Sequence, residues 1–271
     1  MKKANLAILN LMAMMVIMTA AVAACSQSFA KVEPAPSEPK SRDAEACYRR
    51  GLSLHGKGDL EKAVLEFTAA IAIAPRFAEA YNSRGNSLYA KGNVEEAISD
   101  YGRAIEIDSQ TAEFYYNRGM AFFVKGILDQ SIKDFDRAIE LKPRWAQAHN
   151  NRGLAYYSKG NLVEALIDLS RAIEFNPDVA EAYNNRAAIR RELGQTSEAI
   201  DDCDKAIEID PKYAAAYANR GLSRLQCGRK AEAEKDFSRC LELDPAMKAS
   251  LQARIKKLEL QQEARKRMPF A

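Results

Sequence analysis

Residues 112–145 read AEFYYNRGMAFFVKGILDQSIKDFDRAIELKPRW, and residues 146–179 read AQAHNNRGLAYYSKGNLVEALIDLSRAIEFNPDV. Both segments have Arg-Gly at their seventh and eighth positions, Gly at the fifteenth, and Arg-Ala-Ile-Glu near the end. The same period of 34 residues continues on both sides without an insertion, which gives repeats 44–77, 78–111, 112–145, 146–179, 180–213 and 214–247. A strict period of this length predicts a stack of similar units rather than one globular domain.

Small residues recur at fixed positions, which we number as columns one to thirty-four of each repeat. Column eight contains Gly51, Gly85, Gly119, Gly153, Ala187 and Gly221. Column twenty-seven contains Ala70, Ala104, Ala138, Ala172, Ala206 and Cys240. Small side chains in these columns let two antiparallel helices approach closely, while aromatic residues at columns four and twenty-four fill the remaining space.

These columns resemble the tetratricopeptide repeat, and the resemblance covers residues 44–247. It implies an all-α fold, a right-handed alpha-alpha superhelical solenoid of six 34-residue helical hairpins. Glycine at column fifteen is expected to form the turn within each hairpin, and proline at column thirty-two to end the second helix.

Residues 248–271 follow the last repeat and are expected to form a C-terminal capping helix with a basic tail. Leu251, Ile255 and Leu258 share one helical face, which can cover the apolar side that the sixth hairpin leaves exposed. A second interpretation is that the basic run 265–267 contacts anionic lipid or acidic partners.

Residues 1–24 have the features of a secretory signal peptide, since Lys2 and Lys3 precede an apolar run that ends in small residues. The stretch 22–25, Val-Ala-Ala-Cys, resembles a bacterial lipobox, which implies cleavage before Cys25 and a lipid on its thiol. Two other interpretations stay open: ordinary cleavage near Ala23 or Ala30, or an uncleaved helix long enough, at roughly 20 residues, to span a membrane.

The lipobox implies a periplasm-facing lipoprotein of the bacterial cell envelope. Ser26, directly after the cysteine, resembles the residue that directs lipoproteins to the outer membrane. Cleavage without lipidation implies a soluble periplasmic or secreted protein instead. Residues 25–43 contain Pro34, Pro36 and Pro39 without a helical period, so we expect a flexible tether.

Matched charges distinguish these repeats from the general family pattern. Column seven contains Arg50, Arg84, Arg118, Arg152, Arg186 and Arg220. Column twenty-three contains Glu66, Asp100, Asp134, Asp168, Asp202 and Asp236. A turn near column fifteen places both columns at the same height, which predicts one ion pair in each hairpin, worth about 0.2 to 1 kcal/mol when partly exposed.

Other arginines lie close to this ladder. Arg103, Arg137, Arg171 and Arg239 are expected to compete for the same carboxylates. Arg190 and Arg224 occupy column eleven, where an apolar residue is expected, with Arg191 beside Arg190. They either pair with acids such as Glu192, Asp201 or Asp202, or form a local anion site.

The resemblance places columns two, five, six, nine, twelve and thirteen on a concave groove. Asparagines recur there at Asn82, Asn86, Asn117, Asn151, Asn185 and Asn219, and aromatic residues at Tyr89, Phe123 and Tyr157. Side-chain amides can both donate to and accept from a peptide main chain, so we predict peptide binding by these nine residues. The alternative is that the asparagines only keep the groove soluble. The family's chaperone-type carboxylate clamp is not expected, because column two is acidic at Glu45, Glu79, Glu113 and Glu181.

Features of enzymes and metal sites are missing from the sequence. His55 and His149 lie in different repeats, and no phosphate-binding loop, dinucleotide fingerprint or nucleophile elbow occurs. We therefore expect no catalytic residues, no metal, no cofactor and no small-molecule substrate. His149 replaces an aromatic of column four and is expected in the core, as are Cys47, Cys203, Cys227 and Cys240. A disulfide between Cys203 and Cys240 stays open.

Charge argues against nucleic acid as a partner. The repeats carry a formal charge of −4, and the only strong basic excess, +5, lies after residue 247. The expected function is a lipid-anchored scaffold that binds polypeptides of the cell envelope in its groove. The alternative is a self-associating structural spacer that uses its convex face or its basic tail.

Lipidation makes a direct prediction. Cys25→Ser should abolish palmitate labelling and release the chain from membranes, because the diacylglycerol would be attached to the thiol of this residue. Continued labelling of the variant would contradict the assigned cleavage site.

Overall fold

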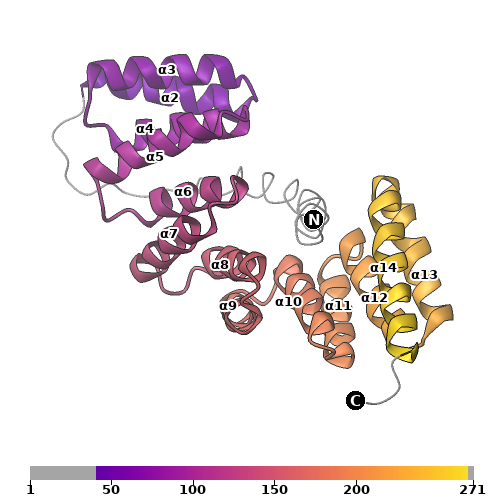
Figure 1. Cartoon of the computed structure of the whole chain (residues 1–271). Helices are drawn as coiled ribbons and strands as arrows, with labels where there is room; N and C mark the ends of the chain where they lie inside the picture. Colours follow the sequence, from indigo (N-terminus) through magenta and orange to yellow (C-terminus); the bar gives the residue numbers. More distant parts are fainter. Residues whose placement is uncertain (1–40, 268–271) are drawn as a thin grey trace. The chain divides into compact units, whose positions relative to one another are not determined.

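The computed structural model describes residues 41–267, and the leader and most of the tether, residues 1–40, lie outside the described residues together with 268–271. The described part is helical throughout. Six hairpins follow one another, formed by α2 (Arg42–Gly56) with α3 (Leu60–Ile73), α4 (Ala78–Ala90) with α5 (Val94–Ile107), α6 (Ala112–Val124) with α7 (Leu128–Leu141), α8 (Ala146–Lys159) with α9 (Leu162–Phe175), α10 (Ala180–Glu192) with α11 (Thr196–Ile209), and α12 (Ala214–Gln226) with α13 (Lys230–Leu243). A short turn η1 (Pro245–Met247) leads into α14 (Lys248–Arg267) (Figure 1).

The all-α fold of six hairpins and a C-terminal helix is thus confirmed for the described residues. The first helix differs slightly from expectation, because it begins at Arg42, inside the predicted tether. Ser41 precedes it, and its side-chain oxygen accepts a hydrogen bond from the Asp43 amide at 3.3 Å. Such capping of a free amide explains why the helix starts before the first repeat.

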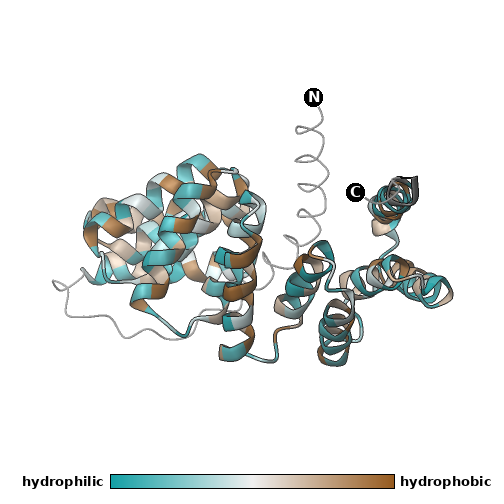
Figure 2. Ribbon diagram, turned by 60° about the horizontal axis from the view of Figure 1, so that its bottom comes forward, coloured by the Kyte–Doolittle hydropathy of each residue, from teal (hydrophilic) through white to brown (hydrophobic). Residues whose placement is uncertain are grey.

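The described part of the chain divides into two compact units, residues 41–143 and 144–267. The first contains α2 to α7, and the second contains α8 to α14. In each unit, neighbouring hairpins stack on one another. Figure 2 shows hydrophobic and hydrophilic residues mixed along the helices of both units. No helix between residues 41 and 267 has both the length and the apolar character that crossing a membrane requires.

Glycine forms the turn of every hairpin, as predicted for column fifteen. These glycines have positive φ, a backbone conformation that other residues rarely adopt: Gly58, Gly92, Gly126, Gly160, Gly194 and Gly228. Each second helix then ends two residues before column thirty-two, where proline stands in five repeats.

The two helices of a hairpin meet through the glycine of column eight. A Cβ atom on Gly85 would lie 2.7 Å from Cε1 of Tyr101, which is the column twenty-four residue of the same hairpin. The fifth hairpin shows the converse arrangement, because Ala187 fills column eight and the smaller Cys203 fills column twenty-four, and the two pack together. The residue sizes at the two columns therefore compensate for each other.

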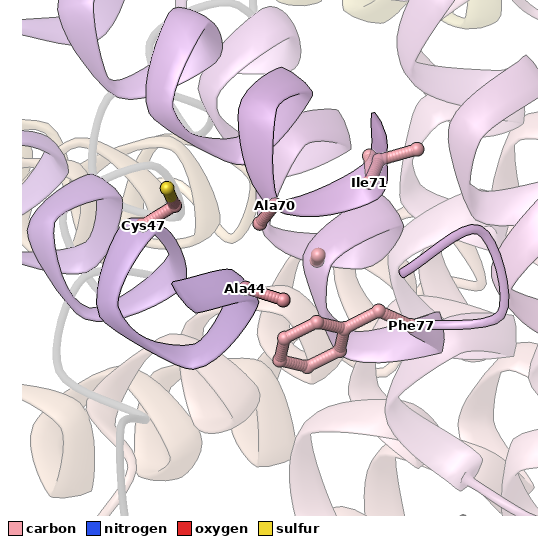
Figure 3. Packing of buried hydrophobic residues seen from close by; sticks show 6 residues of the cluster. Ala44, Cys47, Ala70, Ile71 and Phe77 are labelled. Atoms are coloured by element: carbon pink, nitrogen blue, oxygen red, sulfur yellow. The ribbon is translucent and has the colours of Figure 1, made fainter. Parts of the chain in front are cut away.

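Contacts between hairpins form the remaining core. In the first unit, Ala44 of α2, Ala70 and Ile71 of α3, and Phe77 just before α4 form one cluster with Cys47 (Figure 3). Phe77 is 1% exposed and its ring also lies 4.8 Å from that of Tyr48. The residue that precedes a first helix thus joins it to the hairpin before.

The C-terminal helix α14 covers the end of the second unit. Leu251 packs with Ala218, Cys240 and Met247, while Leu258 packs with Leu222, Leu225 and Ala233. Ile255 lies between the two clusters and contacts both. The predicted capping face is therefore confirmed. The side chains of the basic run 265–267 lie outside the described residues.

The close approach at column eight generates a prediction. Gly85→Ala should lower the free energy of unfolding by about 1 to 3 kcal/mol, because the new methyl group overlaps the Tyr101 ring. Thermal denaturation of the full chain measures the effect. The matched control is Gly56→Ala at the end of α2, where the added Cβ meets open space and stability should not fall. Equal losses in both variants would contradict the packing described for Gly85.

Candidate functional site

The first helices of the hairpins line the inner side of each unit. In the first unit α4 contacts both α2 and α6, and in the second unit α12 contacts both α10 and α14, whereas second helices approach one another less closely. A stack curves toward the helices that lie closer together. We call the inward columns two, five, six, nine, twelve and thirteen the first-helix face.

Asparagines on the first-helix face bond to each other from one hairpin to the next. Asn117 Nδ2 donates to Asn82 Oδ1 at 2.9 Å, and Asn219 Nδ2 donates to Asn184 Oδ1 at 2.7 Å. Asn185 likewise donates to Asn150 at 3.1 Å. In each pair the donor of column six lies 35 residues after the acceptor of column five. The asparagine row therefore connects consecutive hairpins within a unit.

These pairs engage several of the residues predicted to bind a peptide and leave them with different exposures. Asn185 and Asn219 are only 4% and 5% exposed, so their amides face neighbouring side chains more than solvent. Asn82, Asn86, Asn117 and Asn151 are partly exposed. Asn86 accepts a hydrogen bond from the Tyr101 hydroxyl at 2.9 Å, and Asn151 accepts one from Asn150 at 3.1 Å. Peptide binding by these residues stays a prediction.

The three predicted aromatic anchors differ in exposure. Phe123 is buried at 7% exposure, whereas Tyr89 and Tyr157 are partly exposed. The Tyr157 hydroxyl donates to Glu192 Oε1 at 2.6 Å. Burial and the charge of Glu192 raise the pKa of Tyr157 above its ordinary value. This bond again spans 35 residues and connects α8 to α10.

The arginine ladder of columns seven and twenty-three is confirmed in every hairpin. Arg118 Nε and Nη2 each donate to one carboxylate oxygen of Asp134 at 2.8 Å, and Arg84 holds Asp100 in the same two-pronged way at 2.7 Å. The first hairpin uses Glu66, which lies 2.8 Å from Arg50. An acid at each arginine leaves no row of free guanidinium groups for an anion along the six hairpins.

These ion pairs are more buried than expected from the sequence, which predicted partly exposed pairs with a small contribution to stability. The aspartates at column twenty-three in the second to sixth hairpins are buried: Asp100, Asp134, Asp168, Asp202 and Asp236. Burial raises the pKa of Asp134, and the hydrogen bonds from Arg118 oppose that rise without overcoming it. Removal of one partner of a buried pair typically costs about 3 to 5 kcal/mol, well above the value for surface pairs.

The expected competition from neighbouring arginines was wrong for three of the four. Arg103, Arg137 and Arg239 pair with the glutamates three residues later on their own helices, at 2.5 to 2.9 Å. That spacing places both side chains on the same helical face, so the carboxylates of column twenty-three stay with column seven.

The column eleven arginines do pair with acids. Arg190 lies 2.8 Å from Asp202, and Arg224 lies 2.7 Å from Asp236, so each of these carboxylates is shared by two arginines. The pairing interpretation is therefore confirmed for Arg190 and Arg224.

The histidine and cysteine predictions can be examined directly. His149 is 3% exposed, and its Nδ1 lies 3.2 Å from Asp168 Oδ1, which confirms a core role. Cys47, Cys203 and Cys240 are buried free thiols, as expected, but the core prediction was wrong for Cys227, which follows the last residue of α12 and is exposed. Within residues 41–267, no group of three or more His, Cys, Asp or Glu side chains could hold a metal ion.

Sequence reasoning missed the bonds between hairpins, although the sequence carries a signal for them. Asparagine at column five in one repeat is followed by asparagine at column six in the next at Asn82, Asn150 and Asn184. A helical-wheel analysis of a single repeat cannot detect this relation, because the partners belong to different hairpins.

Comparison with protein families gives matches along the repeats. A model described as TPR repeat matches residues 51–92, 85–126 and 119–160. A model described as Tetratricopeptide repeat matches residues 146–179, 180–213 and 214–247. The matches together extend over residues 51–247. No curated protein matches the chain.

Solved structures of similar fold include YrrB, reported as "a TPR protein with an unusual peptide-binding site". It is 25% identical, with a TM-score of 0.56, over 69% of this chain and 96% of YrrB. MamA is 26% identical, with a TM-score of 0.55, over 61% of this chain and 96% of its own. PilF of Pseudomonas aeruginosa covers 83% of this chain and 100% of its own with a TM-score of 0.70. Its 17% identity shows the shared fold alone.

The amide pairs generate a stability prediction. Asn219→Ala should lower the free energy of unfolding by about 1 to 3 kcal/mol, because it leaves the buried Asn184 amide without its donor. The control is Asn161→Ala, an exposed residue before α9 whose side chain makes no capping bond. Chemical denaturation of the full chain checks the difference, and indistinguishable midpoints would refute the role of the pair.

Proposed function

Because this chain belongs to the tetratricopeptide repeat family and is a protein–protein interaction scaffold, we propose that it holds polypeptide segments of cell-envelope proteins on its first-helix face. We further propose that a lipid on Cys25 anchors it to the bacterial envelope membrane, with the repeats facing the periplasm.

The partly exposed amides of the first unit are the observation that carries the binding proposal. Asn82, Asn86 and Asn117 lie together on α4 and α6, with Tyr89 one turn from Asn86. A primary amide has two N–H groups and two oxygen lone pairs. The bond between Asn117 and Asn82 uses one donor and one lone pair, so each side chain retains groups that can bond a peptide main chain.

The free energies of hydrogen bonding and of association indicate that amides alone cannot bind a peptide tightly. Hydrogen bonds contribute about 0.5 to 1.5 kcal/mol each, whereas association costs roughly 4 to 15 kcal/mol. Partly exposed aromatic residues can supply the difference when a ligand covers them. Tyr89 serves in the first unit and Tyr157 in the second, while Phe123 is buried. The similarity to YrrB, with its reported peptide-binding site, supports this role.

The support for envelope location comes from the sequence of the leader. A basic start, an apolar run and the stretch 22–25 together favour lipidation. Triple acylation exceeds the two membrane signals that stable anchoring needs. Ser26 favours the outer membrane, and the tether after Cys25 would let the repeats reach partners away from the lipid surface.

Self-association as a structural spacer is the second candidate. Large apolar side chains project from second helices, at Leu65 of α3 with 69% exposure and at Val163 and Ile167 of α9 with 65% and 54%. Val163 and Ile167 are four residues apart and share one face of their helix. A second copy could cover them, and this surface is separate from the first-helix face.

Site-specific photo-crosslinking in intact bacteria distinguishes the two functions. A photoreactive amino acid at Tyr89 or Tyr157 should crosslink other polypeptides, because both positions lie on the first-helix face. The matched controls are Leu65 and Val163, which are more exposed but lie on second helices. Crosslinks to a second copy from the controls, with none from the tyrosines, would contradict peptide binding and favour the spacer.

A further inference from the structure

Arg254 continues the arginine register beyond the last hairpin. Helix α14 begins 34 residues after α12, so Arg254 stands at column seven of an incomplete seventh repeat. In the six hairpins the arginine of this column pairs with an acid sixteen residues later. Sixteen residues after Arg254 the sequence has Phe270, which cannot neutralise a guanidinium group.

Arg254 turns instead toward the first-helix face of the second unit. Its Nη2 donates to Asn219 Oδ1, an amide oxygen that carries no net charge. Burial, and after it the nearby positive charge of Arg191, together lower the pKa of Arg254 to about 10. Arg254 thus has a neutral hydrogen-bond partner in place of the acid that pairs with the column seven arginine in each of the six hairpins.

Arg191, at the end of α10, is the second cation of this region. Its Nε atom is buried and has no hydrogen-bond partner within the described part of the chain. The neighbouring Arg190 already occupies Asp202. Between residues 41 and 267, neither Arg191 nor Arg254 forms an ion pair with an acid.

One acid lies close by without pairing to either arginine. Glu192 accepts the hydroxyl hydrogen of Tyr157 at 2.6 Å. Both arginines act electrostatically on Tyr157, which places all four residues in one region of the second unit. Two guanidinium groups and one carboxylate leave a net charge of +1 on this part of the first-helix face.

A carboxylate is the ligand that best fits this arrangement. Desolvated cations are costly without a counter-ion, and a carboxylate offers two oxygens that match the fork of a guanidinium group. Phosphate would also match one guanidinium group, but its larger charge would lie beside Glu192. The first-helix face is the surface already proposed for peptides, where carboxylates come from Asp, Glu or a chain end.

We propose that Arg191 and Arg254 form a binding site for a carboxylate of the partner polypeptide. This inference rests on the proposed function and adds a chemical preference to it. The site uses column twelve and the C-terminal helix. It therefore differs from the family's carboxylate clamp at columns two, five and six, which is not expected here because column two is acidic. Asn219 accepts a hydrogen bond from Arg254, and Glu192 accepts one from Tyr157.

Binding of defined peptide pools to the full chain in detergent tests the site. Three fluorescent pools of randomised ten-residue peptides are compared. The first has a central Glu and a C-terminal amide, and the second has a central Gln and a C-terminal amide. The third has a central Gln and a free C-terminal carboxylate. Wild type should bind a carboxylate-bearing pool about tenfold more tightly than the Gln amide pool. The pool that shows this preference tells whether a side chain or a chain end supplies the carboxylate.

Variants assign the preference to the two arginines. Arg254→Gln and Arg191→Gln should each reduce it to twofold or less and leave binding of the Gln amide pool unchanged. Lys256→Gln, an exposed position on the same helix as Arg254, should keep the full preference. Circular dichroism verifies that each variant retains its helical content, and either arginine variant alone is sufficient for the test.

Two results would overturn the inference. Equal binding of all three pools by wild type, or a preference that survives in either arginine variant, would rule out the carboxylate site while peptide binding stands. Failure of every pool to bind wild type would instead contradict the proposed peptide-binding function, and the site with it.

Discussion

The paired arginine and carboxylate of columns seven and twenty-three are the interaction on which the rest of this structure depends. Each pair connects the two helices of a hairpin at one height, next to the glycine that allows their close approach. In the second to sixth hairpins the acid is buried, and the arginine pairs with this acid of its own hairpin instead of turning toward the first-helix face. That face carries amides and tyrosines, which can bond to one another or to a peptide, together with the acids of column two and Arg191 of column twelve.

The fold could be predicted from the sequence because each structural requirement recurs in the same column. A turn glycine at column fifteen and a small residue at column eight mean little once, but six occurrences in register leave few alternatives. The exception in the fifth hairpin follows the same rule, since Ala187 is matched by the small Cys203. The ion pairs followed from helix geometry alone, because both columns belong to one hairpin.

The candidate site was less predictable, for a physical reason. Bonds between hairpins depend on how far apart neighbouring first helices lie and how they are rotated, and a single repeat specifies neither. The amide of Asn185 was therefore expected to face a peptide, whereas it donates to Asn150 and is buried. The burial of Asp134 was also missed, since the sequence predicted only a partly exposed pair with Arg118. Arg254 could have been recognised by extending the register past residue 247.

The central claim is that arginines at column seven stabilise the hairpins, whereas Arg254 at the same column is left without an acid. Comparison of Arg118→Gln with Arg254→Gln in thermal denaturation of the full chain tests this most directly. We predict that the first variant loses about 3 to 5 kcal/mol, because it leaves Asp134 buried without its partner. The second should lose no stability, since glutamine keeps an amide for Asn219 and removes an uncompensated charge. Equal losses in the two variants would contradict the account.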